Sequence, residues 1–177
     1  MPDMTTPDVD GPDQQPVAAL IEEAMKKAPV AWISVAGGRP FLVWCAWLND
    51  ALYVVSGPGE QAAPGLADAR ECTVTARGDN GARIVTWPAR VSRLSPGVDP
   101  WDQVVTALAG KRLNLPASDD TATRWATECV VNRLEPAGSP IEAGDSLPND
   151  SLAAEPPPTP AARRVTAPFH LHRVHRR

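Results

Sequence analysis

The stretch VAWISVAGGRPFLVWCAWLNDALYVVS, residues 30–56, decides the fold of this chain. It holds three apolar runs rich in Val, Ile, Trp and Tyr, separated by a Gly-Gly pair at 37–38 and an Asn-Asp pair at 49–50. Such runs favour strands, and such pairs favour tight turns. The stretch therefore predicts an antiparallel meander of three strands, at residues 30–36, 40–48 and 51–56.

Further strands follow toward the C-terminus. ECTVTAR (71–77) and ARIVTWPARVSRL (82–94) have strand-like composition and flank the hairpin signal GDNG. The Pro within the second of these runs indicates a bulge or an edge position. The run TRWATECVVNRL (123–134) is ambiguous, because its residues alternate as in a strand while its first half also suits a helix.

Helical periodicity occurs at the flanks of these strands. Pro16 opens a segment with one apolar stripe that runs to Ala28, and Asp99-Pro100 precedes another that ends at Gly110. A short helix is predicted near 67–70. Six strands and two or three helices in non-alternating order predict a mainly β fold with flanking helices, built on a six-stranded antiparallel barrel.

Composition divides the chain into a packed body and two tails. Pro residues cluster at both ends, and the charge follows the same division: −4 over residues 1–15, −4 over 138–161 and +5 over 162–177, leaving −1 for the body. A nearly neutral body gives no global electrostatic case for nucleic acid. We therefore expect a disordered acidic tail at 1–15, a barrel domain at 16–137, and a Pro-rich linker with a basic His/Arg tail at 138–177.

The reactive residue types exclude several classes of site. The three Cys are widely spaced and odd in number, which indicates buried free thiols and suits a reducing cytoplasm. We find neither a signal peptide nor a membrane span. All three His lie in the last eight residues, so the body holds no His-based triad or His metal centre, and we predict no metal site. The terminal FHLHRVHRR suits a solvated basic tail; a transition metal or an anionic partner is the alternative.

The Gly-rich segment SGPGEQAAPGL (56–66) is the most informative loop. A strand that leads through such a turn into a helix can offer backbone N–H groups to a phosphate. The segment matches neither the P-loop nor the dinucleotide-binding fingerprint. Glu60 and Asp68 could form a carboxylate pair, but solvated loop positions are the better interpretation.

The order of elements, together with SGPGEQ (56–61), PGLADA (64–69) and the closing RLEP (133–136), resembles a known family. It is similar to the pyridoxamine 5′-phosphate oxidase-like, FMN-binding split-barrel family, and within it to actinobacterial members, over residues 16–137. The resemblance implies a six-stranded split barrel, a homodimer, and FMN or a deazaflavin coenzyme in a groove at the dimer interface.

Carried over by position, the resemblance also implies a site. The turn would face the cofactor phosphate, Arg77 would supply a cationic contact, and Thr86 and Trp87 would lie beside the ring system. The turn residues concerned are Ser56, Gly57 and Gln61. Gln61 stands where the family usually has Lys or Arg, so either Arg77 or Arg83 compensates or the cofactor has been lost.

The expected function is a flavin- or deazaflavin-dependent oxidoreductase that acts on a small molecule, with no catalytic residue assigned. The alternatives are a non-catalytic split-barrel module that binds another ligand or acts as a dimeric scaffold, and an interaction protein whose tails do the work. Residues 165–175 are apolar enough in places to dock on the barrel.

Overall fold

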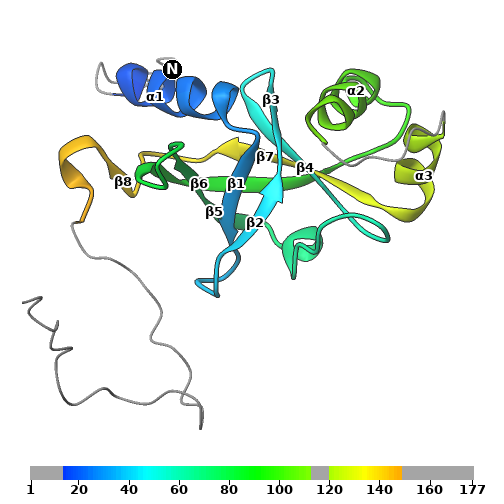
Figure 1. Ribbon diagram of the computed structural model, residues 1–177, viewed down its shortest axis with the longest axis horizontal. Helices are drawn as coiled ribbons and strands as arrows, with labels where there is room; N and C mark the ends of the chain where they lie inside the picture. The colour runs from blue at the N-terminus through cyan, green and yellow to red at the C-terminus, as the bar shows by residue number, and fades with distance from the viewer. Residues whose placement is uncertain (1–13, 113–119, 149–177) are drawn as a thin grey trace, which may run out of the picture.

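The computed structural model describes residues 14–112 and 120–148 and has a nearly closed antiparallel barrel at its centre (Figure 1). The strands lie in the order β2-β1-β5-β6-β7-β4-β3, and β8 pairs with β6. The strands are β1 (Val30–Ser34), β2 (Phe41–Trp44), β3 (Ala46–Leu48), β4 (Ala51–Ser56), β5 (Glu71–Arg77), β6 (Arg83–Leu94), β7 (Val130–Pro136) and β8 (Glu142–Ala143). The α-helices are α1 (Gln14–Lys27), α2 (Trp101–Lys111) and α3 (Thr121–Glu128), with 3-10 turns at Leu66–Asp68 and Gly144–Ser146.

The mainly β fold with flanking helices is confirmed, and period-two patterning explains its strands. On β5 the apolar Cys72, Val74 and Ala76 are buried, while the residues between them face outward. On β5 this alternation places one face in the core and leaves the other for solvent or ligands, whereas β4 is buried on both faces, between the two apolar cores. None of the helices in the described part of the chain is long and apolar enough to cross a bilayer.

The strand expected at 40–48 is instead two strands, β2 and β3, with a break at Cys45. The backbone N–H of Trp44 donates to the side-chain oxygen of Gln61 at 2.6 Å, and that of Cys45 donates to the Pro29 carbonyl at 3.0 Å. The Cys45 bond continues the β1–β2 register, in which Trp44 lies opposite Val30, whereas the Trp44 N–H points away from β1 toward Gln61. β2 then pairs with β1 and β3 pairs with β4, so the strand count differs from the predicted six.

The ambiguous run at 123–134 contains both alternatives in succession. Its first half belongs to α3 and its second half to β7, and the extended Cys129 lies between them. Packing also continues beyond residue 137, where we expected the linker to begin, because β8 pairs with β6. The tail expected at 1–15, apart from residues 14 and 15 in α1, and the part of the 138–177 segment beyond residue 148 lie outside the described residues.

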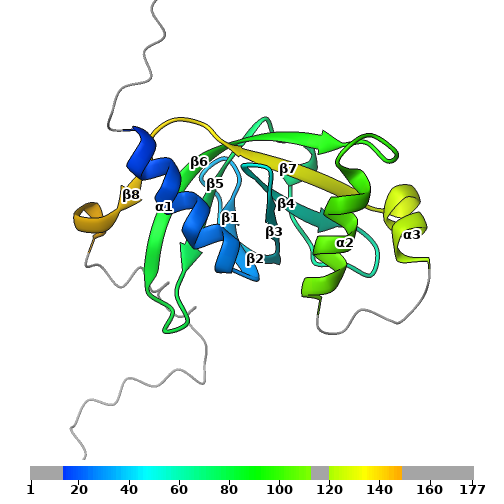
Figure 2. The same ribbon diagram turned by 90° about the horizontal axis from the view of Figure 1, so that it is seen from above.

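Two apolar cores hold the molecule together. One fills the barrel and includes Trp87 and Leu134, and α1 closes it with Ile21 and Met25. The other lies between the β3-β4-β7 part of the sheet and helices α2 and α3. The views in Figures 1 and 2 show α1 apart from the α2–α3 pair, on different sides of the barrel. The outward faces of β1, β5 and β6 line an open groove to which no helix contributes a residue.

Candidate functional site

The candidate site is this open groove, called the outer groove below. Its floor consists of outward-facing side chains that the strand register brings side by side. Thr75 on β5 lies opposite Trp32 on β1 and Thr86 on β6. One step along the same face, Thr73 lies opposite Ser34 and Pro88. The floor is therefore a band of hydroxyl groups bordered by Trp32 and Pro88.

One end of the outer groove, the arginine end, is a hollow of about 470 Å³. Three guanidinium groups and one carboxylate border it, so the charged side chains sum to +2. A concave surface with this excess of positive charge favours an anionic group on a ligand. The lining residues are Trp32, Ser34, Arg39, Pro40, Thr73, Thr75, Arg77, Arg83, Thr86, Ile141 and Glu142.

A chain of hydrogen bonds orders the hydroxyls at this end. The Thr86 hydroxyl donates to Glu142 Oε2 at 3.0 Å and lies 3.0 Å from the Thr75 hydroxyl. The other carboxylate oxygen of Glu142 accepts from Arg83 at 3.4 Å, and Arg83 also donates to the Pro148 carbonyl at 2.8 Å. Since Thr86 uses its proton on Glu142, Thr75 is the donor to Thr86. β8 and the chain after it thus form one wall of the site.

Arg77 covers the aromatic side of the arginine end. Its guanidinium carbon lies 5.3 Å from the centre of the Trp32 ring, within the range of a cation–π contact. Arg77 also donates to the Gly81 carbonyl at 3.2 Å, which ties its side chain to the hairpin. A cation beside an aromatic face suits a ligand that carries both a negative charge and a flat ring.

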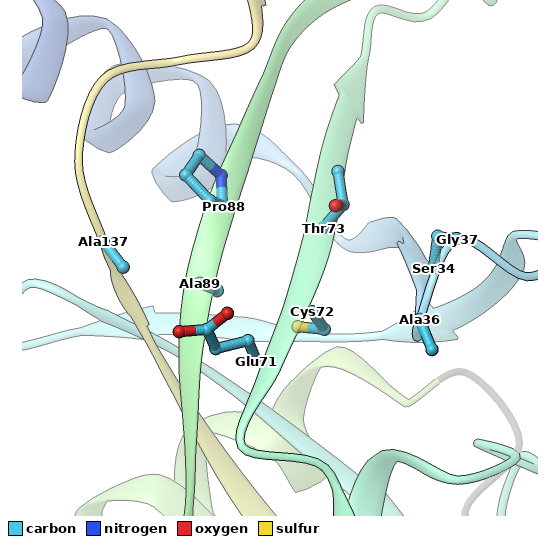
Figure 3. A pocket seen from close by; sticks show the side chains of 9 residues that line it. All are labelled: Ser34, Ala36, Gly37, Glu71, Cys72, Thr73, Pro88, Ala89 and Ala137. Carbon is cyan, nitrogen blue, oxygen red and sulfur yellow. The ribbon is translucent and has the colours of Figure 1, made fainter.

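The other end of the outer groove, the Cys72 end, is a hollow of about 270 Å³ that shares Ser34 and Thr73 with the arginine end. Figure 3 shows the side chains of Glu71 and Cys72 extending from β5 toward β6, with Ala137 on the other side of β6. Burial raises the pKa of the Cys72 thiol to about 12, so it is neutral at physiological pH. Glu71 is therefore the charged residue of this end.

The Gly-rich loop after β4 is fixed by packing and ion pairs. A Cβ on Gly57, whose φ is +147°, would lie 2.9 Å from Cys129 Cα and Sγ, so only glycine fits this approach. Glu60, whose side chain is fully buried, pairs with Arg112 and, at 2.5 Å, with Arg124, and it accepts from Trp125 Nε1 at 2.9 Å. The interpretation of Glu60 as a solvated loop carboxylate is therefore wrong.

The other two predicted turn residues also lie away from the outer groove. The side-chain oxygen of Gln61 accepts from the Trp44 backbone, as described above, and Ser56 is buried at the end of β4. Neither residue lines the groove. Among the described residues, the loop and the groove are thus two separate places within one copy of the chain.

Of the three predicted residues on β5 and β6, the structure brings two into the groove. Arg77 and Thr86 line the arginine end. Trp87 does not, because it is fully buried in the barrel and meets Trp47 edge-to-face at 6.2 Å. Successive strand residues point to opposite faces, so Thr86 and Trp87 cannot border the same outer surface. A bound ring system beside Trp87 would have to lie on the opposite face of β6 from Thr86.

Sequence reasoning missed most of the groove lining. Thr73, Thr75 and Arg77 recur at every second position of β5, so the alternation was a signal that their side chains share a face. Glu142 gave no such signal, because it reaches the groove from a two-residue strand in a segment read as linker. No group of three or more metal-ligating side chains gathers among the residues that the structure describes.

Comparisons with known proteins give similarity in structure alone. No family model matches the sequence, and no curated protein matches it. The heme storage protein HutZ from Vibrio cholerae is similar at 16% identity with a TM-score of 0.48, over 71% of this chain and 93% of that one. An FAD-binding protein from Mesorhizobium loti is similar at 16% identity and 0.46, over 70% and 90%. A candidate pyridoxamine 5′-phosphate oxidase from Listeria innocua is similar at 14% identity and 0.46, over 70% and 97%.

Proposed function

We propose that the outer groove binds a flavin-type cofactor, FMN or a deazaflavin, and that the protein acts as an oxidoreductase on a small molecule. The observation that carries the proposal is the arginine end, where guanidinium groups, hydroxyls and the Trp32 ring border one hollow. A flavin mononucleotide offers the matching chemistry, since it combines a phosphate, a polyol and a flat ring. The sequence resemblance to the split-barrel family supports the same choice.

The groove residues would bind and orient such a cofactor. Arg39 and Arg77 would hold its phosphate by charge-assisted hydrogen bonds, and Trp32 would contact its ring. The Gly-rich loop of the same copy supplies no cation, because residues 56–66 contain no Lys or Arg, and the side-chain oxygen of Gln61 is already bonded to the Trp44 N–H. The bound cofactor would supply the redox chemistry, while the protein supplies position and electrostatics. The absence of His from residues 16–137 is compatible with a site in which the cofactor carries out the redox chemistry.

We also propose that the active unit is a homodimer. The family resemblance implies a cofactor at the dimer interface, which would let the loop of one copy approach the groove of its partner. Two apolar side chains near the groove support an interface there. Ile141, which lines the arginine end, is 57% exposed, and Leu42 on the neighbouring β2 is 38% exposed.

The test is a titration of the purified protein with FMN and with a deazaflavin, followed by fluorescence. Saturable binding is expected, and Arg77→Ala should weaken it roughly tenfold or more, because a charge-assisted hydrogen bond contributes about 1.5–3 kcal/mol. Arg70→Ala is the matched control, since Arg70 is exposed and lines neither end of the groove. Equal affinity of the Arg77→Ala and wild-type proteins would refute the site, and sedimentation velocity on the same samples reports the oligomeric state.

One observation favours the non-catalytic alternative. Glu142 already pairs with Arg83 and accepts from Thr86, so an internal carboxylate satisfies part of the arginine end. A groove whose positive charge is partly neutralised in this way could serve as a scaffold surface or bind an uncharged ligand. Turnover of a reduced flavin or deazaflavin with any acceptor would exclude this alternative.

A further inference from the structure

A second hollow, called the Tyr53 hollow below, lies on the side of the barrel that faces α2. Its volume is about 450 Å³, close to that of the arginine end, and it shares no residue with the outer groove. Strands β4, β6 and β7 and the segment before α2 form it. The lining residues are Asn49, Tyr53, Ser92, Arg93, Leu94, Asp99, Pro100 and Arg133.

Three of these residues form a row across adjacent strands. Tyr53 on β4 lies directly opposite Arg133 on β7, and Arg133 lies directly opposite Ser92 on β6. Residues that are opposite in an antiparallel pair have neighbouring side chains on the same face. A phenol, a guanidinium and a hydroxyl therefore stand side by side in the floor of the hollow.

Tyr53 is the polar residue of this row that is most deeply buried. It is only 1% exposed and packs in the core beneath α2, yet it lines the hollow. Its hydroxyl has no hydrogen-bond partner among the residues that the structure describes. A buried phenol usually finds such a partner, so its free hydrogen-bonding capacity at the wall of a hollow points to a ligand.

The charges around the hollow select the kind of ligand. Arg93 and Arg133 line it, against one lining carboxylate, Asp99. Glu135 binds Arg133 at 2.9 Å, and Asp68 binds Arg93 at 2.8 Å outside the hollow. The lining residues alone carry an excess of one positive charge, which matches one negative charge and not the two of a phosphate dianion.

We propose that the Tyr53 hollow binds the carboxylate of a small organic acid. The Tyr53 hydroxyl and the free N–H groups of Arg133 donate to the carboxylate, since a guanidinium presents five donors and Glu135 engages one of its nitrogens. Leu94 and Pro100 give the remainder of the acid an apolar contact. This site is independent of the outer groove and does not require a cofactor there.

The test uses the fact that Tyr53 is the only tyrosine in the chain. In the full-length protein with ε-¹³C-labelled tyrosine, every ring signal reports on this hollow. Titration with benzoate should shift these signals saturably in the millimolar range. Benzamide, which has the same shape without the charge, should bind at least tenfold more weakly.

Two variants test whether Tyr53 and Arg133 bind the carboxylate. Arg133→Gln should weaken benzoate binding at least tenfold, while Arg70→Gln, at an exposed arginine outside the hollow, should leave it unchanged. Tyr53→Phe, followed through the backbone amide signal of residue 133, should also weaken it, and this variant decides the matter if Arg133→Gln does not fold. Equal shifts by benzoate and benzamide, unchanged affinity in both variants, or no saturable shift with benzoate would overturn the proposal.

Discussion

Glu60 is the residue on which the position of the Gly-rich loop depends. Its fully buried carboxylate lies between Arg112 and Arg124, whose side chains are 13% and 28% exposed. Arg124 also donates to the Pro58 carbonyl at 2.8 Å, so the same side chain holds the loop at two points. The loop is thereby anchored to the end of α2 and to α3.

Removing the charge of Glu60 should be costly. In Glu60→Gln, two partly buried guanidinium groups lose their counter-ion, and breaking a buried ion pair in this way lowers the free energy of unfolding by about 3 kcal/mol. Urea unfolding followed by tryptophan fluorescence measures the change. Glu22→Gln is the matched control, because Glu22 and Lys26 form an exposed helix pair that contributes at most about 0.5 kcal/mol. If both variants lose a similar free energy of unfolding, the buried cluster stabilises the fold no more than an exposed ion pair does.

At the scale of the element, the break between β2 and β3 depends on a side chain from outside the sheet. Gln61 accepts from the Trp44 N–H, which points away from β1 at the edge of the sheet. In Gln61→Met, the Trp44 amide should exchange with solvent about two- to tenfold faster, as expected for the loss of one net hydrogen bond. The Cys45 amide, which donates to Pro29, should be much less affected.

Hydrogen exchange measured by two-dimensional NMR checks this prediction. Gln103→Met is the control, since Gln103 lies exposed on α2 and makes no hydrogen bond through its side chain among the described residues. If the Trp44 amide exchanges equally fast in wild type and Gln61→Met, the side chain does not stabilise the bend.

The elements that sequence reasoning found are those with a local signal. β1, β4, β5 and β6 have runs of alternating burial or β-branched residues, and α2 has a periodic apolar face. The break at Cys45 could not be found, because the groups that accept the N–H groups of Trp44 and Cys45 belong to Gln61 and Pro29, each 16 residues from Cys45. β8 has two residues and no periodicity, so only its pairing with β6 reveals it.

The same limit applies to the candidate site. Arg77 and Thr86 were placed by the family resemblance, and the structure brings both to the outer groove. Trp87 could have been excluded from strand parity alone. Glu60 could not have been assigned to an ion cluster, because Arg112 and Arg124 are more than 50 residues away in sequence.

At the scale of the whole molecule, the barrel core should make stability depend on alkaline pH. Burial raises the pKa of Cys45 and of Cys72 from 9.0 to about 12. Between these values the unfolded chain has lost the thiol protons while the folded chain keeps them. The unfolded state then binds fewer protons, so the free energy of unfolding falls as pH rises, by up to about 1.4 kcal/mol per pH unit for each thiol.

Denaturant unfolding at several pH values between about 8 and 11 measures this slope. The double variant Cys45→Ala/Cys72→Ala should show a shallower fall than wild type. Cys129→Ala should keep most of the wild-type slope, because Cys129 lies partly exposed outside the barrel core. If the free energy of unfolding falls with pH at the same rate in wild type and the double variant, the prediction is wrong.

The length of β6 determines how far apart two ligands would sit. Thr86 belongs to the arginine end of the outer groove and Ser92 to the Tyr53 hollow, and the six residue steps from one to the other span about 20 Å at roughly 3.3 Å per residue. Atoms that react must approach within about 3–3.5 Å. Within one copy of the chain, a molecule at the arginine end and a molecule in the Tyr53 hollow therefore cannot pass a hydride or a group directly to each other. They can be present at the same time without competing, and anything exchanged between them must travel through solvent.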